Sequence, residues 1–136
     1  MTFEEVVKSL PNGFHDAKVR KIMVDYEGRS IAMEMELLVG MPGAPNSESY
    51  EIGTLTVAPF FFFIVEPPDP SYDFVPDGKP LHVVGDSAKA AQSPTFDSLM
   101  ADLSKKVESY RFFIEEWNSF LYIAGESVAF SWDDRG

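Results

Sequence analysis

The sequence of 136 residues contains no cysteine. This excludes disulfide bonds, a thiolate nucleophile and cysteine-ligated zinc or iron–sulfur sites, and it fits a reducing compartment. Long hydrophobic runs are also missing, because the longest mostly apolar stretch, residues 55–65, is about half as long as a membrane-spanning helix. Glu4 and Glu5 stand where a secretory signal carries basic residues. We therefore expect a soluble, cytoplasmic protein with no membrane partner.

Positive charge is scarce as well. The chain has 11 Lys and Arg against 22 Asp and Glu, a formal net charge of −11 at pH 7. Between residues 22 and 78 all the charged side chains but Arg29 are acidic. A field of this sign repels nucleic-acid phosphates, so we expect no nucleic-acid partner. It would attract a basic protein partner; the alternative is an acidic surface that serves solubility alone.

Catalytic motifs are absent too. The chain has two histidines, His15 and His82, and neither stands in an H-x-x-x-H, H-x-H or EF-hand spacing. No G-x-S-x-G, P-loop or dinucleotide-binding fingerprint occurs. Two histidines among many acids are compatible with a metal site, but without ligand spacing we predict no metal, no cofactor and no catalytic residue.

The histidine at position 15 is followed directly by Asp16, just past a Pro-Asn-Gly turn. Neighbours in an extended chain point to opposite faces, so Asp16 would not orient the His15 ring as a triad acid does. We interpret the pair as a structural corner, in which Asp16 caps backbone N–H groups and His15 bonds across the turn. A binding surface and a catalytic role remain alternatives.

The chain is rich in aromatic residues, which make up 14% of the total, and its apolar residues recur at helix or strand spacing in several segments. Thr2 to Glu5 form a capping-box pattern that begins an amphipathic helix ending near residue 10. Residues 31–39 alternate as a strand with one buried face, and residues 17–26 form its hairpin partner with a bulge. We place the positive-φ residue of the turn between them at Gly28.

Two glutamates, Glu34 and Glu36, share the outer face of the strand at residues 31–39. They are candidates for paired acids, but the solvated face of an amphipathic strand has the same pattern, and we favour the solvated face. Together with His15 and Asp16 they are our candidate binding residues.

Further strands are predicted at residues 50–58 and 60–66. The second, with four consecutive phenylalanines, reads as a strand buried on both faces, and the first helix is a candidate lid for it. Residues 67–94 hold six of the ten prolines and are predicted to be an irregular excursion with one short strand at 81–84.

The last third returns to strands after a helical pattern at residues 96–103. Residues 110–114 and 117–124 are aromatic-rich, and residues 128–132 alternate after the turn at Gly125, which predicts a C-terminal hairpin. The chain is then a single α+β domain, residues 1–136. It is built on a mainly antiparallel sheet of about six or seven strands with two short helices, and curling into a barrel is an open alternative.

The segment LPNGFHDA at residues 10–17, the two strands after it, Glu66-Pro67-Pro68 and Glu116-Trp117-Asn118-Ser119-Phe120 resemble a small family of uncharacterised bacterial proteins. The Phe-His-Asp segment is also distantly similar to immunity proteins of bacterial polymorphic toxin systems. The resemblance implies a compact bacterial domain that binds a protein. The family pattern contains no catalytic residues to carry over.

These observations lead to one favoured function and two alternatives. We expect a non-enzymatic domain that binds a basic protein through an acidic surface, one form of which is an immunity-type inhibitor of a basic toxin. The first alternative is a small-molecule binder or enzyme with a pocket near His15 and His82. The second is a homodimer that pairs through its phenylalanine-rich edge.

Overall fold

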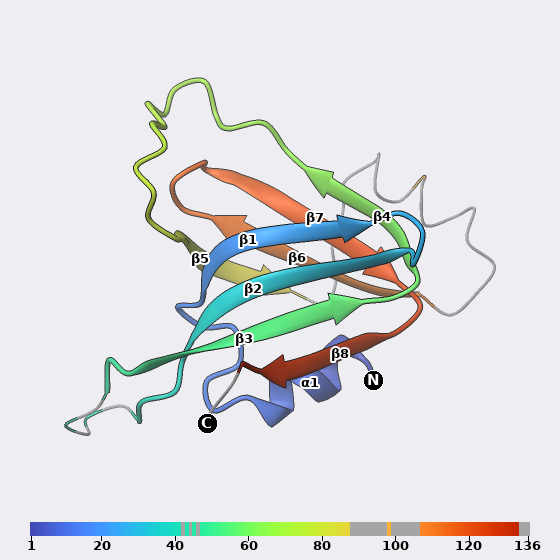
Figure 1. Ribbon diagram of the computed structural model, residues 1–136. Coiled ribbons are helices and arrows are strands. Elements are labelled where there is room, and N and C mark those ends of the chain that lie inside the picture. The colour runs from blue at the N-terminus through green and yellow to red at the C-terminus, as the bar shows by residue number, and fades with distance from the viewer. Residues whose placement is uncertain (42, 44, 46, 88–97, 99–106, 134–136) are drawn as a thin grey trace.

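The computed structural model describes residues 1–41, 43, 45, 47–87, 98 and 107–133. Within these ranges the chain forms a short helix and eight strands (Figure 1): α1 (Phe3–Ser9), β1 (Lys18–Asp25), β2 (Ser30–Leu38), β3 (Tyr50–Val57), β4 (Phe60–Val65), β5 (Leu81–Ser87), β6 (Glu108–Ile114), β7 (Ser119–Gly125) and β8 (Val128–Trp132). Among the residues described, no helix has the length and apolar character needed to cross a membrane.

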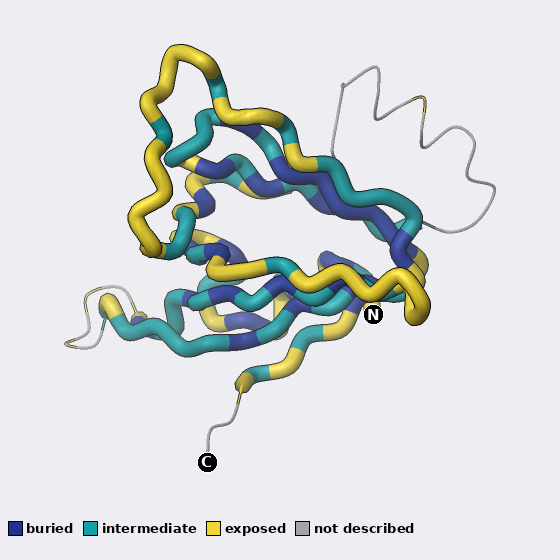
Figure 2. The backbone as a smooth tube through the Cα atoms, turned by 45° about the horizontal axis from the view of Figure 1, so that its top comes forward, coloured by how far each residue is buried: buried dark blue, intermediate teal, exposed yellow. Residues whose placement is uncertain are grey.

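All strands belong to one antiparallel sheet in the order β4-β7-β6-β5-β1-β2-β3-β8. β1 and β5 share only the register pairs Lys18↔His82 and Val19↔Leu81, and this narrow junction divides the sheet into two halves. The halves β1-β2-β3-β8 and β4-β7-β6-β5 face each other across the core (Figures 1 and 2). The predicted antiparallel sheet with a short helix is confirmed, but it has eight strands and is not closed into a barrel.

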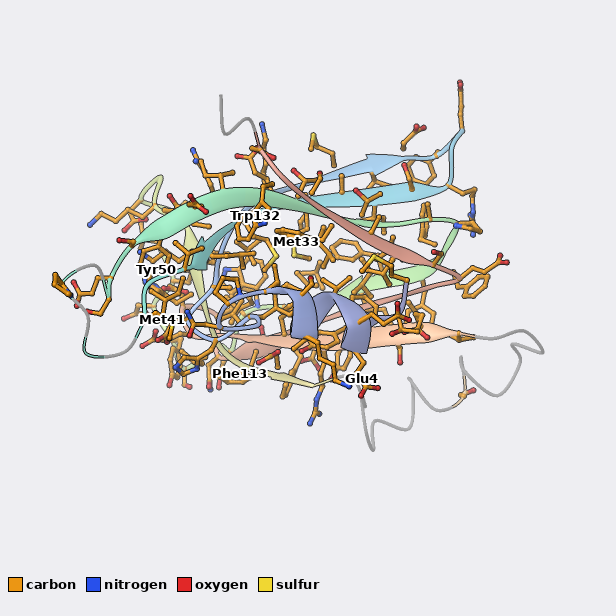
Figure 3. The ribbon with its side chains drawn as sticks, turned by 90° about the horizontal axis from the view of Figure 1, so that it is seen from below. Glu4, Met33, Met41, Tyr50, Phe113 and Trp132 are labelled. Atoms are coloured by element: carbon orange, nitrogen blue, oxygen red, sulfur yellow. The ribbon has the colours of Figure 1, made fainter. Side chains whose placement is uncertain are left out.

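The core lies between the two halves and is clearest along β2. Its inward side chains are completely buried and its outward ones are not, as the period-two pattern predicted. Met33, one of the inward residues, points into the space between the halves (Figure 3). Burying a side chain of this size contributes about 1.5–3 kcal/mol, so the alternation fixes which face of β2 turns inward.

Helix α1 begins as the capping box predicts, with the Thr2 hydroxyl accepting a hydrogen bond from the Glu5 backbone N–H at 3.1 Å. Its buried residue Phe3 stacks on Tyr110 of β6 with ring centroids 4.8 Å apart. The helix contacts β8 and β6. The predicted role of the helix as a lid on residues 60–66 is therefore wrong, because its apolar face packs on the other strands.

The β1–β2 hairpin and its bulge, between Val19 and Lys21, are confirmed. The residue with positive φ in the turn is Arg29 (φ 52), which corrects the placement at Gly28. Gly28 lies against the exposed side chain of Asp25 instead. Its backbone N–H donates to the Asp25 carboxylate at 3.0 Å, and a Cβ at Gly28 would lie 2.7 Å from that carboxylate.

Strand β4 is an edge strand, which corrects the prediction of a strand buried on both faces. Phe60 is buried, but the rest of the strand is half-buried or exposed. Phe63 packs on the main core, whereas Phe62 and Ile64 pack on the opposite face against Tyr122 of β7. Among the residues that the structure describes, β4 pairs with β7 alone, and a homodimer through its other side remains a prediction.

The proline-rich segment is irregular as predicted, since residues 66–80 contain no helix or strand, and the predicted short strand corresponds to β5. Asp69 ties this segment to the turn after β6 by accepting from the Asn118 side chain at 2.7 Å and by donating its backbone N–H to the Trp117 carbonyl. β5 then occupies the middle of the sheet, between β6 and β1. Residues 88–94 and the predicted helix at 96–103, except Ser98, lie outside the described residues.

The predicted C-terminal hairpin is wrong. β7 lies between β4 and β6 in one half of the sheet, while β8 pairs with β3 in the other. At the crossing the chain passes tightly against the β3–β4 junction. A Cβ at Gly125 would lie 2.3 Å from the Val57 side chain and 2.7 Å from the Pro59 carbonyl oxygen. This glycine is therefore needed for a close approach of two segments.

Candidate functional site

The Phe-His-Asp segment forms a turn that is anchored from inside. Phe14 is 1% exposed and contacts the rings of Tyr110 and Phe112 edge-on, at centroid distances of 5.4 and 5.3 Å. His15 and Asp16 lie outside this anchor, with 77% and 54% of their side chains exposed. Phe14 thus holds the corner in place, and the two polar residues project into solvent.

His15 and Asp16 contact each other, contrary to the expectation for extended neighbours. The His15 Nε2 and an Asp16 carboxylate oxygen are 3.2 Å apart. The contact arises because the segment turns, with φ at 58° in Asp16, and does not run extended. Solvent exposure of both groups makes such a pair weak, so it offers little of the rigidity that a catalytic dyad needs.

Glu34 and Glu36 occupy the outer face of β2 as predicted, but their surroundings differ. The Glu34 carboxylate lies 3.5 Å from Arg20 Nε and 3.7 Å from Lys21 Nζ, both on β1. Glu36 lies opposite Lys18 in the register and close enough to Tyr50 to influence its ionisation. The two glutamates therefore do not form a paired-acid site, because Glu34 is matched by bases.

A polar groove lies at the end of the sheet where β1 and β5 begin and β2 ends. It has a volume of about 550 Å³ and is lined by residues from several segments: Asp16, Lys18, Leu38, Ser47, Glu48, Tyr50 and His82. Tyr50 is at the end of the molecule near Met41 (Figure 3), and the Lys18 ammonium lies 4.2 Å from its ring centroid. The predicted pocket near the histidines thus has a counterpart beside His82.

Negative charge is concentrated around this groove. Burial raises the pKa of Tyr50, and the nearby carboxylates of Asp16, Glu48 and Glu36 raise it further. A phenol whose ionisation is opposed by three carboxylates reports a local negative field. We call the group Asp16, Glu36, Glu48, Glu115 and Glu116, gathered around Tyr50 and His82, the acidic end.

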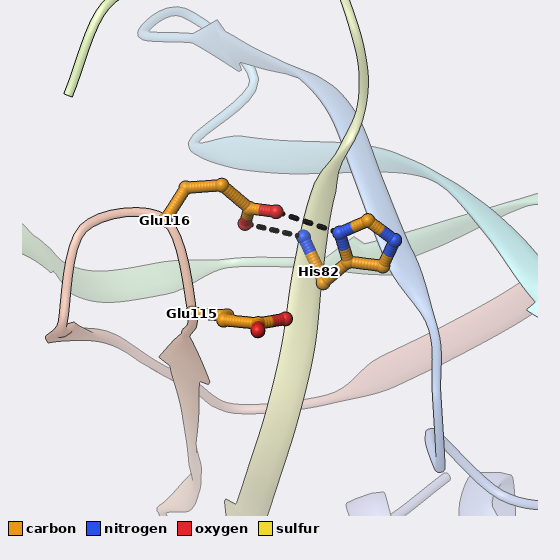
Figure 4. A group of neighbouring side chains, drawn as sticks. All are labelled: His82, Glu115 and Glu116. Atoms are coloured by element: carbon orange, nitrogen blue, oxygen red, sulfur yellow. Dashed lines mark hydrogen bonds and ion pairs between the residues drawn. The ribbon is translucent and has the colours of Figure 1, made fainter.

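The strongest polar contact at the acidic end joins His82 to Glu116 (Figure 4). The His82 Nδ1 lies 2.6 Å from one Glu116 carboxylate oxygen, and the His82 backbone N–H donates to the other oxygen at 2.7 Å. Partial burial opposes ionisation of Glu116, but these hydrogen bonds outweigh it and lower the pKa of Glu116. The carboxylate is therefore held ionised and fixed against β5.

Glu115 completes a compact cluster. Its backbone N–H donates to the His82 carbonyl at 2.9 Å, and one side-chain ligand atom from each of His82, Glu115 and Glu116 lies within 4.8 Å of the others. A depression of about 400 Å³ adjoins the cluster, and its charged lining includes Asp73, Asp77 and Lys79. The side chains that converge here are of types that bind metal ions or take part in proton transfer.

Sequence reasoning missed both glutamates of this cluster. His82 and Glu116 are 34 positions apart and meet because β5 pairs with β6, whose end carries the turn at residues 115–118. No local spacing could have indicated the contact, because it depends on which strands become neighbours.

Comparison of the chain with protein-family models, with curated proteins and with solved structures finds no significant match. The resemblance to an uncharacterised bacterial family and to immunity proteins therefore remains a prediction.

Proposed function

We propose that the protein is a non-enzymatic bacterial domain that binds a basic protein through its acidic end. The observation that carries the proposal is the gathering of carboxylates from separate segments at one end of the sheet: Asp16 and Glu48 line the groove, Glu36 lies near Tyr50, and Glu115 and Glu116 lie beside His82. An immunity-type inhibitor of a basic toxin is the form that the sequence resemblance favours.

The acidic end differs from the outer face of β2 in how many basic side chains lie near its carboxylates. On the outer face of β2, Glu34 lies between two bases, so its field is partly cancelled. At the acidic end Asp16, Glu36 and Glu48 lie near Tyr50 and Lys18, and Glu115 and Glu116 lie beside His82, where Lys79 lines the adjoining depression, so the carboxylates outnumber the bases. An unbalanced field of this kind speeds the encounter with a positively charged partner and disfavours acidic ones.

The groove also suits a particular side chain. An arginine or lysine of the partner would find the carboxylates of Asp16 and Glu48 beside the face of Tyr50, a combination of charge and ring that binds cations. Lys18 already lies over that ring. A partner cation would therefore compete with Lys18, and removal of the lysine charge should strengthen binding.

The experiment is affinity capture from a bacterial lysate at low and at high salt, with captured proteins identified by mass spectrometry. The wild-type protein should retain a basic partner at low salt and lose it at high salt. The triple variant Asp16→Asn, Glu36→Gln, Glu48→Gln should retain at least tenfold less, and Lys18→Gln should retain more.

The matched control is the double variant Glu27→Gln, Glu126→Gln. Both glutamates are exposed; Glu27 lies in the β1–β2 turn and Glu126 between β7 and β8, far from the β3 start that carries Tyr50 (Figure 1). It should bind like the wild type. The proposal would be contradicted if the amount of captured partner did not depend on salt concentration. It would also be contradicted if the control and the triple variant lost the same amount of partner.

A small-molecule or enzymatic role is the second candidate, favoured by the orientation of one ring. Glu116 engages Nδ1 of His82, so Nε2 points away from the carboxylate (Figure 4), and His82 also lines the polar groove. Under this alternative a ligand screen by protein-observed NMR should perturb Tyr50 and His82 together, without any protein partner.

A further inference from the structure

We propose that His82, Glu115 and Glu116 form a binding site for a divalent transition-metal ion of the Zn²⁺ type. One ligand atom from each side chain lies within 4.8 Å of the other two. The site goes beyond the proposed protein binding, because it needs no partner and uses side chains that sequence spacing did not connect.

The backbone prepares the three ligands. His82 is the second residue of β5, and its N–H donates to one Glu116 oxygen at 2.7 Å. Its carbonyl accepts from the Glu115 N–H at 2.9 Å. These bonds tie the turn after β6 to the start of β5, so the carboxylates and the imidazole stay close together (Figure 4). Preorganisation of this kind reduces the entropy lost when an ion binds.

The donor set matches a particular class of ion. One imidazole nitrogen and two carboxylate oxygens suit Zn²⁺, which binds such groups at about 2.0–2.2 Å in tetrahedral geometry. Three protein ligands leave a fourth position for water. Ca²⁺ takes about six to eight oxygen ligands and Mg²⁺ keeps most of its water, so both should bind far more weakly.

An ion can reach this cluster from solvent, and the ligand side chains can move to bind it. The His82 and Glu116 side chains are 47% and 29% exposed, and Glu115 is exposed. Donors of a tetrahedral ion are about 3.3–3.5 Å apart, so His82 Nδ1 and the Glu116 oxygen, now 2.6 Å apart, must separate by less than about 1 Å while Glu115 adjusts to them. The glutamate side chains can rotate to do this without disturbing the core. The ion would replace the proton between the His82 Nδ1 and the Glu116 carboxylate, and that proton would leave to solvent.

The experiment is calorimetric titration of the chelator-treated, full-length protein with ZnCl₂ alone. The wild type should bind one Zn²⁺ per chain, and CaCl₂ and MgCl₂ should give no comparable heat. His82→Gln should weaken Zn²⁺ binding at least tenfold, and Glu115→Gln should weaken it as well. CoCl₂ provides a second readout, because a tetrahedral site gives visible absorption bands that His82→Gln should abolish.

The matched control is His15→Gln, which removes the other histidine of the chain together with its carboxylate contact. It should bind Zn²⁺ like the wild type. Absence of Zn²⁺ binding in the wild type overturns the proposal. So does equal weakening by His15→Gln and His82→Gln, because that would indicate nonspecific surface binding. If His82→Gln misfolds by circular dichroism, the exposed Glu115→Gln decides the outcome. The titration contains no protein partner, so its failure would leave the proposed function intact.

Discussion

The protein contains two histidine–carboxylate pairs that the sequence and the structure rank in opposite order. His15 and Asp16 are adjacent in the chain and form a loose pair at 3.2 Å, with most of the imidazole exposed. His82 and Glu116 are far apart in the chain but are joined at 2.6 Å, with a second hydrogen bond through the backbone. Adjacency in sequence brings groups near each other, whereas pairing of strands holds them in a fixed geometry.

The difference comes from what supports each pair. Around His15 the rigid element is Phe14, which is buried in the core while its polar neighbours point outward. Around His82 the support is the polar backbone itself, because β5 and the β6–β7 turn exchange hydrogen bonds directly beside the side chains. We therefore expect the first pair to matter little by itself and the second to be energetically coupled.

The largest expected effect tests the anchor of the first pair. Phe14→Ala should lower the free energy of unfolding by about 3–5 kcal/mol, because it leaves a cavity against two aromatic rings. Chemical denaturation monitored by circular dichroism measures this. His15→Ala, next to it, should change stability by less than about 0.5 kcal/mol. Similar losses for both would show that the corner depends on its polar residues.

The next effect concerns Glu116 and its pH dependence. Glu116→Gln should cost about 1–2 kcal/mol at pH 7, because two hydrogen bonds from His82 lose their charged acceptor. The pKa of Glu116 is lowered on folding, so this stabilisation is present above its ordinary value near 4.5 and is lost as pH falls through the folded value. Denaturation curves are measured for the wild type and Glu116→Gln in the presence of a chelator. The difference between their free energies of unfolding should therefore be smaller at pH 3 than at pH 7.

A smaller effect compares the coupling within each pair. Double-mutant cycles to alanine should give a coupling energy of about 1 kcal/mol for His82 and Glu116, and less than about 0.5 kcal/mol for His15 and Asp16. Urea denaturation of the six variants and the wild type provides both values. Equal coupling in the two cycles would refute the distinction drawn between the pairs.

The smallest effect is at Asp16. Its φ of 58° is a conformation that glycine adopts without strain, so Asp16→Gly should change the free energy of unfolding by only a few tenths of a kcal/mol. Asp16→Val, a β-branched residue at the same φ, should be clearly less stable. Thermal denaturation of these two variants separates the role of the backbone from that of the carboxylate.

Local patterns were sufficient for much of the fold. The capping box at Thr2, the alternation along β2 and the bulge after Val19 each depend on residues within one or two turns of chain, and all three are confirmed. The prediction of strand pairing failed where strands next to each other in sequence pair with strands that are distant in sequence. β7 and β8 read as a hairpin, yet each has another partner, and Gly125 is tightly packed because the chain crosses between the halves there.

The residues of the candidate site also divide into those that local sequence patterns indicated and those that only the tertiary structure brought together. His15, Asp16, Glu34 and Glu36 were identified because they are conspicuous in local pattern, and the structure places Asp16 and Glu36 at the acidic end while Glu34 is matched by bases. Glu115 and Glu116 occupy the turn between β6 and β7; Glu116 begins a segment noted for its resemblance to a bacterial family, but no local spacing marks either glutamate as part of a site. Their importance depends on a contact 34 positions away.

The sequence by itself determined helix α1, the approximate positions of the strands, the inward face of β2 and the excess of negative charge, because periodicity and composition act over a few residues or over the whole chain. The tertiary structure decided the strand order, the position of the acidic end and the His82–Glu116 contact. These depend on which strands become neighbours, and that choice is made by burial of the whole apolar surface and not by any single segment.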